Sequence, residues 1–190
     1  AEGFETQGDR VTAVRTADGP MHAEEIVLAA GAWTGRLASA LGLRVPVQPA
    51  KGYSVTVPAP DGGPRLPTIL TDEKLTITPM PGRLRFAGTL ALAGFDATVD
   101  ARRAAPIRAL AGRYAPAAAE HAPVWSGFRP CSPDGLPIIG RSPRHRNLTL
   151  ATGHGMMGIT LAPVTGDLVA HLVAGTMPAL DVRPLAPDRF

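Results

Sequence analysis

Apolar and polar residues alternate in the first stretch of the chain, as is typical of a half-buried β-strand. Residues 10–15 read Arg-Val-Thr-Ala-Val-Arg, with every second side chain apolar. Asp18 and Gly19 then form a turn signal, and residues 21–26 follow as the returning strand. The chain is therefore expected to begin with a β-hairpin.

The middle of the chain, residues 46–136, shows the same alternation several times. Gly- and Pro-containing turn signals such as Pro81-Gly82 separate the alternating segments, which favours antiparallel hairpins. Asp100 can cap a helix that runs to about Tyr114. This part is therefore predicted to form an antiparallel sheet with one helix. Its expected strands are 53–57, 68–71, 75–80, 83–89 and 124–129.

Two other segments are apolar without alternation, which indicates strands buried on both faces, as in a parallel sheet. One is 26–30, which ends at Gly31 and is followed by a short predicted helix over 34–41. The other is 148–152, followed by a glycine-rich loop and a long helix from about Gly158 to Ala174. Strands that lead through glycine into a helix are typical of nucleotide-binding α/β layers.

These patterns predict an α/β (α+β) fold with two parts. Residues 1–45 and 137–190 are expected to form a nucleotide-binding α/β layer, and residues 46–136 an antiparallel-sheet domain inserted into it. An insertion explains why the two buried strands lie on either side of the alternating region.

Composition narrows the class of protein. The 190 residues include 45% hydrophobic residues, enough for a sizeable core, and a single cysteine, which excludes an intrachain disulfide. The net charge is +3, yet no run of Lys or Arg exceeds two residues, so we do not expect nucleic-acid binding. No signal-peptide pattern or membrane-span length occurs. A soluble cytoplasmic protein is predicted, with peripheral membrane association left open.

The glycine-rich loop is the first candidate for chemistry. It reads Gly-His-Gly-Met-Met-Gly-Ile-Thr over 153–160 and lies between a strand and a helix. Glycines allow close approach of a ligand, and a helix start offers free N–H groups and a positive dipole end. These groups would suit a pyrophosphate or the edge of a flavin that gains negative charge on reduction. The alternative is a tight turn without a ligand.

Two further segments are candidates. Residues 125–137 place Arg129 in an apolar setting, where its guanidinium needs either a ligand carboxylate or an internal partner. Small residues end the apolar strand within 27–33 and leave room either for a ligand or for close helix packing. Cys131 has no histidine paired with it by sequence, and a small buried residue is the expectation.

Four strings together resemble the FAD-dependent D-amino-acid oxidase superfamily, above all bacterial D-amino-acid dehydrogenases and glycine oxidases. They are IVLAAGAW (26–33), PVQPAKGYS (46–54), GFRPCSPDGLPIIG (127–140) and LATGHGMMGITLAP (150–163). The resemblance covers essentially the whole chain. It identifies the split layer as part of an FAD-binding domain and the inserted part as the substrate domain.

The resemblance also assigns residues. It implies that Arg129 binds the substrate carboxylate and that Tyr53 is a candidate substrate contact, a place in the sheet core being an equal alternative. His154 is expected to be structural, and the other histidines lack metal-ligand spacing, so no metal is expected. The residues implied to line the cofactor are Ala30, Gly31, Trp33, Gly155, Met156, Met157, Gly158, Ile159 and Thr160.

The function implied is oxidative deamination of D-amino acids, with hydride passing from the substrate Cα to flavin N5 and oxygen or a quinone as the final electron acceptor. A glycine- or sarcosine-type amine oxidase is the alternative. The N-terminal half of such enzymes carries GxGxxG and an acidic ribose ligand, and neither pattern occurs here. A fragment is therefore expected, with FAD bound weakly or not at all by this chain alone. The fragment would pair with a separate N-terminal half, self-associate, or be non-catalytic.

Overall fold

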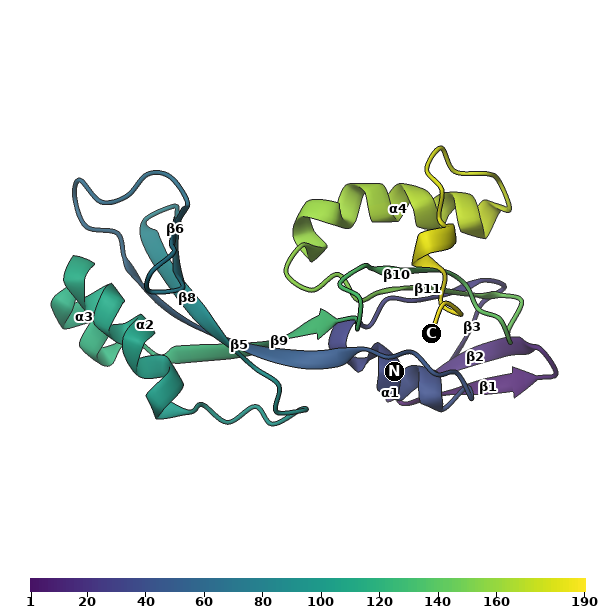
Figure 1. Ribbon diagram of the computed structural model, residues 1–190. Helices are drawn as coiled ribbons and strands as arrows, with labels where there is room; N and C mark the ends of the chain where they lie inside the picture. Colours follow the sequence, from purple (N-terminus) through teal and green to yellow (C-terminus); the bar gives the residue numbers. More distant parts are fainter. The chain divides into compact units, whose positions relative to one another are not determined.

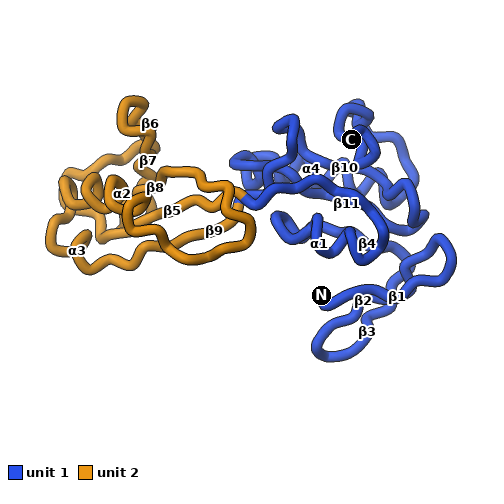
Figure 2. The backbone as a smooth tube through the Cα atoms, turned by 60° about the horizontal axis from the view of Figure 1, so that its bottom comes forward, with its two compact units in different colours: residues 1–49, 129–190 blue, residues 50–128 orange.

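The computed structural model describes residues 1–190, and the chain divides into two compact units. Unit 1 comprises residues 1–49 and 129–190, and unit 2 comprises residues 50–128 (Figure 2). The sequence placed the two limits at 45/46 and 136/137, so residues 46–49 and 129–136 lie in unit 1 rather than in the inserted part. The assignment of the units to cofactor and substrate stays a prediction.

Unit 1 contains two three-stranded sheets. The first is an antiparallel meander of β1 (Gly3–Gln7), β2 (Arg10–Thr16) and β3 (Gly19–His22). The hairpin of β2 and β3 was predicted, but its second strand spans 19–22 and not 21–26. Strand β1 was not predicted, because its sequence GFETQ has no apolar alternation and only Gly3 is buried.

The second sheet of unit 1 has the order β10-β11-β4. Strand β11 (Leu148–Thr152) pairs in parallel with β4 (Ile26–Leu28) and antiparallel with β10 (Ile138–Arg141). The prediction that β4 is buried on both faces is wrong, because Val27 is 42% exposed while its neighbours on either side are buried. Only one face of β4 packs on the core of unit 1.

Helices surround this second sheet. The 3₁₀ helix η1 (Gly31–Trp33) and the helix α1 (Thr34–Ser39) follow β4, and the 3₁₀ helix η2 (Arg183–Leu185) lies near the end of the chain. Helix α4 (Gly158–Ala174) lies over β10 and β11 (Figure 1). Of its apolar side chains only Leu168 is fully buried, so much of this apolar helix remains at the surface. The buried cluster of unit 1 is Val11, Ile26, Leu28, Ala38, Leu41, Leu43, Val45, Ile138, Leu148 and Leu150.

Unit 2 is built on a five-stranded sheet of order β6-β7-β8-β5-β9. The pairs β6–β7, β7–β8 and β8–β5 are antiparallel, as the alternation predicted. The bounds are Gln48–Pro58 (β5), Thr68–Leu70 (β6), Leu75–Met80 (β7), Arg83–Ala91 (β8) and Val124–Cys131 (β9).

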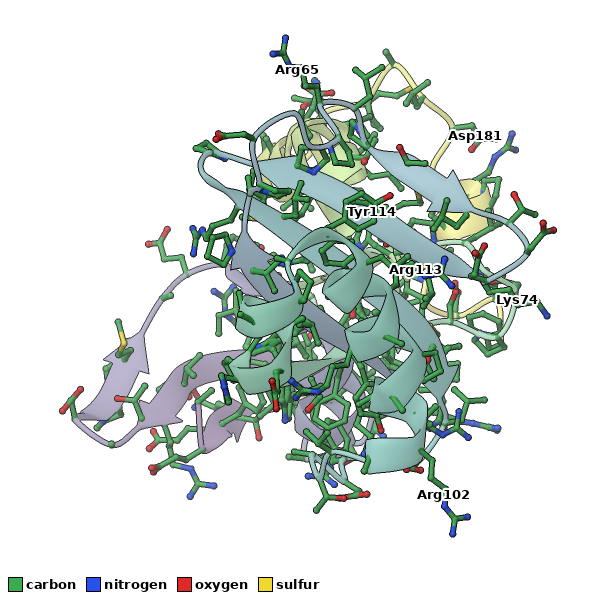
Figure 3. All side chains as sticks on the ribbon, turned by 90° about the vertical axis from the view of Figure 1, so that its left-hand side faces the viewer. Arg65, Lys74, Arg102, Arg113, Tyr114 and Asp181 are labelled. Atoms are coloured by element: carbon green, nitrogen blue, oxygen red, sulfur yellow. The ribbon has the colours of Figure 1, made fainter.

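Two helices accompany this sheet where one was predicted. Helix α2 (Ala101–Tyr114) packs on β8, and the unpredicted α3 (Pro116–His121) packs on α2. In Figure 3 Tyr114 lies against the sheet, and its ring centroid is 5.4 Å from that of Phe86. Arg65 and Arg102 project outward at separate places in the same view, so these two charges do not converge. No helix of the chain combines the length and apolar character needed to cross a membrane.

Candidate functional site

The parallel pairing of β4 and β11 brings two distant segments to one edge of a sheet. Leu28 lies opposite Leu150, and both strands end in the same direction. The residues that follow them, 29–33 and 153–157, therefore lie at the same carboxyl edge, where ligands bind in open α/β sheets. The Thr152 hydroxyl joins them directly, because it donates a hydrogen bond of 2.9 Å to the Gly31 carbonyl.

Glycine is required at this edge by the backbone. Gly31, Gly153 and Gly155 have φ values of +54°, +77° and +55°, in the left-handed region that side chains disfavour. No atom lies within 4 Å of the position that a Cβ would take at Gly31 or Gly155. The backbone is therefore open on the side where a ligand could approach.

The start of α4 leaves donors free at the same edge. Its N-cap residue, Met157, makes no side-chain capping hydrogen bond. The N–H groups of Gly158, Ile159 and Thr160 have no partner within the helix, because no helical carbonyl lies four residues before them. They lie at the positive end of the helix dipole. The Gly155 N–H differs from the expectation, because it already donates to the Pro130 carbonyl at 2.8 Å. The free donors at the start of α4 are therefore the N–H groups of 158–160.

Large apolar side chains are exposed in the two segments that follow the strands. Ile159 is 94% exposed, and Met156 and Met157 are also exposed. Trp33, after the other strand, is half exposed. Exposed apolar side chains next to unpaired N–H groups suit a ligand with a flat apolar body and a polar edge.

His154 connects the glycine loop to α4. Its Nε2 lies 3.0 Å from the Thr165 hydroxyl, and partial burial lowers the pKa of its imidazole. A neutral imidazole held by a helix residue fits a structural role better than that of a mobile base. No three His, Cys, Asp or Glu side chains of the chain are grouped as metal ligands would be.

Arg129 lies in β9, and the glycine loop is bonded to the residues that follow it. The Pro130 carbonyl accepts the hydrogen bond from Gly155, and Cys131 forms an isolated β-bridge with His154. The Arg129 side chain is partly buried and makes no hydrogen bond or ion pair. If Arg129 had a purely structural role, its guanidinium would pair with a carboxylate or carbonyl of the chain, and the structure shows no such pair.

Two threonines near this edge, Thr34 and Thr152, were not among the predicted site residues. Thr34 is completely buried at the start of α1, and its hydroxyl has no hydrogen-bond partner. Buried hydroxyls are almost always paired, so an unpaired one is unusual, and because its oxygen is covered by protein it does not face the open backbone at Gly31. Thr152 ends an otherwise apolar strand, and that polar residue at the strand end was the available signal.

Tyr53 is the one candidate residue that belongs to unit 2. It is 2% exposed and belongs to the buried cluster of the five-stranded sheet. The Lys51 ammonium, also buried, lies 5.7 Å from the centre of its ring. This is the core position that the alternative expected, and substrate contact by Tyr53 stays a prediction.

Comparison with known proteins places the chain among flavin enzymes. Residues 1–172 match the family described as FAD dependent oxidoreductase, DAO. The chain is 44% identical over 187 residues to a D-amino acid dehydrogenase of Paramagnetospirillum magneticum, covering 96% of this chain and 44% of that protein. It is 38% identical over 192 residues to one of Granulibacter bethesdensis, of which it covers 46%. The chain thus spans less than half the length of these relatives.

Solved structures agree with the sequence comparison. The glycine oxidase of Geobacillus kaustophilus superposes with a TM-score of 0.85 at 34% identity, over 99% of this chain and 51% of that chain. The iminodiacetate oxidase of a Chelativorans species superposes with a TM-score of 0.81 at 29% identity, over 97% of this chain and 52% of that chain.

Proposed function

The chain belongs to the DAO family of FAD-dependent oxidoreductases, and we propose that the protein oxidises amino acids, with D-amino acids as its substrate class. The curated relatives support this class, since they carry the name D-amino acid dehydrogenase. The observation in the structure that carries the proposal is Arg129, a partly buried cation without a hydrogen-bond or ion-pair partner. The next residue, Pro130, accepts a hydrogen bond from Gly155 of the glycine loop.

The residues at the sheet edge fit FAD. The open backbone at Gly31 and Gly155 and the free N–H groups of 158–160 would hold the flavin part of the cofactor. The N–H groups at the start of α4 favour negative charge, so they would stabilise the reduced flavin more than the oxidised one. Ala30, Trp33, Met156 and Met157 would contact it as well.

Arg129 supplies the substrate site. Its planar guanidinium can donate two parallel hydrogen bonds to a carboxylate, which fixes both the position and the orientation of an α-amino acid. When bound, FAD supplies the acceptor for the hydride from the substrate Cα, and water then hydrolyses the imine to a 2-oxo acid and ammonia. The protein itself needs no acid or base if the amine binds in its neutral form.

A glycine- or sarcosine-type amine oxidase is the second candidate, favoured by the likeness to glycine oxidase. Both reactions use the same carboxylate contact, so Arg129 does not separate them. A panel of D-alanine, glycine and sarcosine, assayed with oxygen and with a quinone as acceptors, separates both the substrate class and the acceptor. D-amino-acid turnover that exceeds glycine and sarcosine turnover supports the first proposal.

The carboxylate role is tested by Arg129→Ala in the FAD-loaded protein. Charge-assisted hydrogen bonds contribute about 1.5–3 kcal/mol each, so kcat/KM for amino acids should fall on the order of 100-fold. Arg129→Lys should recover little, because an ammonium cannot donate in a planar fork. Flavin absorbance and affinity should remain close to those of the unmodified protein.

Arg146→Ala is the matched control, because this arginine forms an exposed pair with Asp9. It should change kcat/KM little. If Arg129→Ala instead releases FAD or unfolds the protein while substrate binding is retained, Arg129 is structural and the proposal is wrong.

A further inference from the structure

The last arginine of the chain, Arg189, uses all five of its N–H donors. Its Nε and Nη2 donate to the two carboxylate oxygens of Asp134 at 2.8 and 3.1 Å. Nη2 also donates to the Leu136 carbonyl at 3.0 Å, and Nη1 to two carbonyls of the 183–190 segment at 2.9 and 3.0 Å. The guanidinium therefore joins the end of the chain to the turn at 134–136 by a complete set of bonds.

This turn lies immediately after the Arg129 segment. Asp134 also accepts a hydrogen bond of 3.1 Å from the Leu136 N–H, which closes the turn. Arg129, the Pro130 bond to Gly155 and the Cys131 bridge to His154 precede it by only a few residues. The 129–136 segment is thus held on one side by the glycine loop and at its far end by Arg189.

The segment that carries Arg189 is itself packed on the sheet. A Cβ at Gly140 in β10 would lie 2.6 Å from Cδ of Pro187, so the glycine is what allows this close approach. Arg189 is only 14% exposed on its side chain. These contacts distinguish the pair from a mobile surface ion pair, whose contribution is small.

We propose that the Arg189–Asp134 pair is a positioning device that holds the Arg129 segment in register with the glycine loop. Arg189 touches neither substrate nor cofactor in this role, which rests on the proposed carboxylate function of Arg129. A charged fork that makes three of its five bonds to the turn restricts it more than a neutral contact could. Because near-attack geometry tolerates little displacement, a segment released at 134 would present Arg129 less well to a substrate carboxylate.

The single cysteine provides a test that needs neither flavin nor substrate. Cys131 lies between Arg129 and Asp134 and is partly exposed. Its rate of reaction with the disulfide reagent DTNB reports local opening of the segment. Asp134→Asn preserves the shape of the side chain and removes its charge, and it should raise this rate on the order of tenfold. Arg189→Lys should act in the same direction to a smaller extent.

A second, nearby pair serves as the matched control. Arg183 donates to both oxygens of Asp181 from Nε and Nη2, at 2.8 to 3.1 Å, but the two residues are only two positions apart. The Asp181 side chain, labelled in Figure 3, is half exposed. Asp181→Asn breaks an equally short ion pair that joins no distant segments, so it should leave the Cys131 rate unchanged.

The double variant Asp134→Asn, Arg189→Gln, measured beside its two single variants, separates positioning from general destabilisation. If both residues act through one pair, the double variant should react no faster than the faster single variant. The proposal is overturned if the two single-variant increases in the Cys131 reaction rate multiply in the double variant, or if Asp181→Asn raises that rate as much as Asp134→Asn does. An unchanged rate in Asp134→Asn also overturns it.

Kinetics of the FAD-loaded protein complete the test. Asp134→Asn should raise KM for amino acids several-fold more than it lowers kcat, with FAD affinity unchanged, and it should add nothing in an Arg129→Ala background. An additive effect in that background overturns the positioning role. If Arg129→Ala itself leaves KM normal while Asp134→Asn still opens Cys131, the proposed function fails and the structural link between the pair and the segment stands.

Discussion

At the scale of single residues, two glycines of similar conformation allow the effect of backbone strain to be measured separately from the effect of ligand contact. Gly155 in the glycine loop and Gly8 in the β1–β2 turn have φ values of +55° and +59°, and both have open space at the Cβ position. Alanine at either should reduce the free energy of unfolding by about 1–2 kcal/mol, the cost of the left-handed conformation. Only Gly155→Ala should also weaken FAD, by at least tenfold, since only its methyl would enter the proposed cofactor site. Urea unfolding and flavin titration measure the two effects, and equal flavin affinity in both variants would contradict the cofactor assignment.

Also at the residue scale, Asp134 makes stability depend on pH in a defined window. Its hydrogen bonds from Arg189 lower the pKa of the carboxyl from 3.8 to about 2. A depressed folded-state pKa stabilises the fold above the unfolded-state pKa, and this contribution is lost as pH falls from about 4 to about 2. The melting temperature of Asp134→Asn should therefore fall less steeply over that window than that of the unmodified protein. Parallel curves for the two proteins would show that the pair contributes no pH-dependent stability.

At the scale of elements, the sequence predicted those whose pattern is local and missed those fixed by distant contacts. The alternation at 10–15 and 75–80 is recovered as strands, and the helix ending before Gly175 is recovered because this glycine takes a left-handed conformation. Strand β10 was not predicted, because Gly140 is typical of a turn, whereas in the structure it allows the close approach of Pro187, 47 positions later in the chain. Helix α3 was not predicted either, although the proline at its first position is a sequence signal for a helix start.

The start of α2 offers a test at the element scale. Asp100 caps this helix, because its carboxylate accepts a hydrogen bond of 2.9 Å from the Arg102 N–H. Asp100→Ala should reduce the free energy of unfolding of unit 2 by about 1 kcal/mol, and Asp100→Asn should lose only a small part of that, because asparagine caps equally well. Chemical denaturation followed by far-UV circular dichroism measures both. Equal losses in the two variants would assign the effect to charge, including the Arg103 pair at 3.8 Å, and not to the cap.

At the scale of the whole molecule, the sequence identifies the segments of the candidate site but not the contacts that bring them together. The glycine loop, the 30–33 segment and Arg129 each stand in recognisable strings. The bonds that join them connect positions far apart, such as Thr152 with Gly31 across 121 residues and Arg189 with Asp134 across 55. No local pattern encodes such pairs, because they depend on which strands become neighbours and on where the chain ends pack.

The two units give the last prediction, because each has a hydrophobic cluster of its own. Phe86 is fully buried in the cluster of unit 2, and Leu150 is fully buried in that of unit 1. Phe86→Ala should cost about 3–5 kcal/mol and Leu150→Ala about 2–5 kcal/mol, through lost burial and the cavity left behind. Since no residue belongs to both clusters, each variant should lose protection mainly in its own unit. Hydrogen exchange resolved by peptide should therefore speed up in β7, β8 and α2 for Phe86→Ala, and in β10, β11 and β4 for Leu150→Ala. If either variant lost protection equally in both units, the chain would unfold as one cooperative body, and the separate clusters would not act as separate sources of stability.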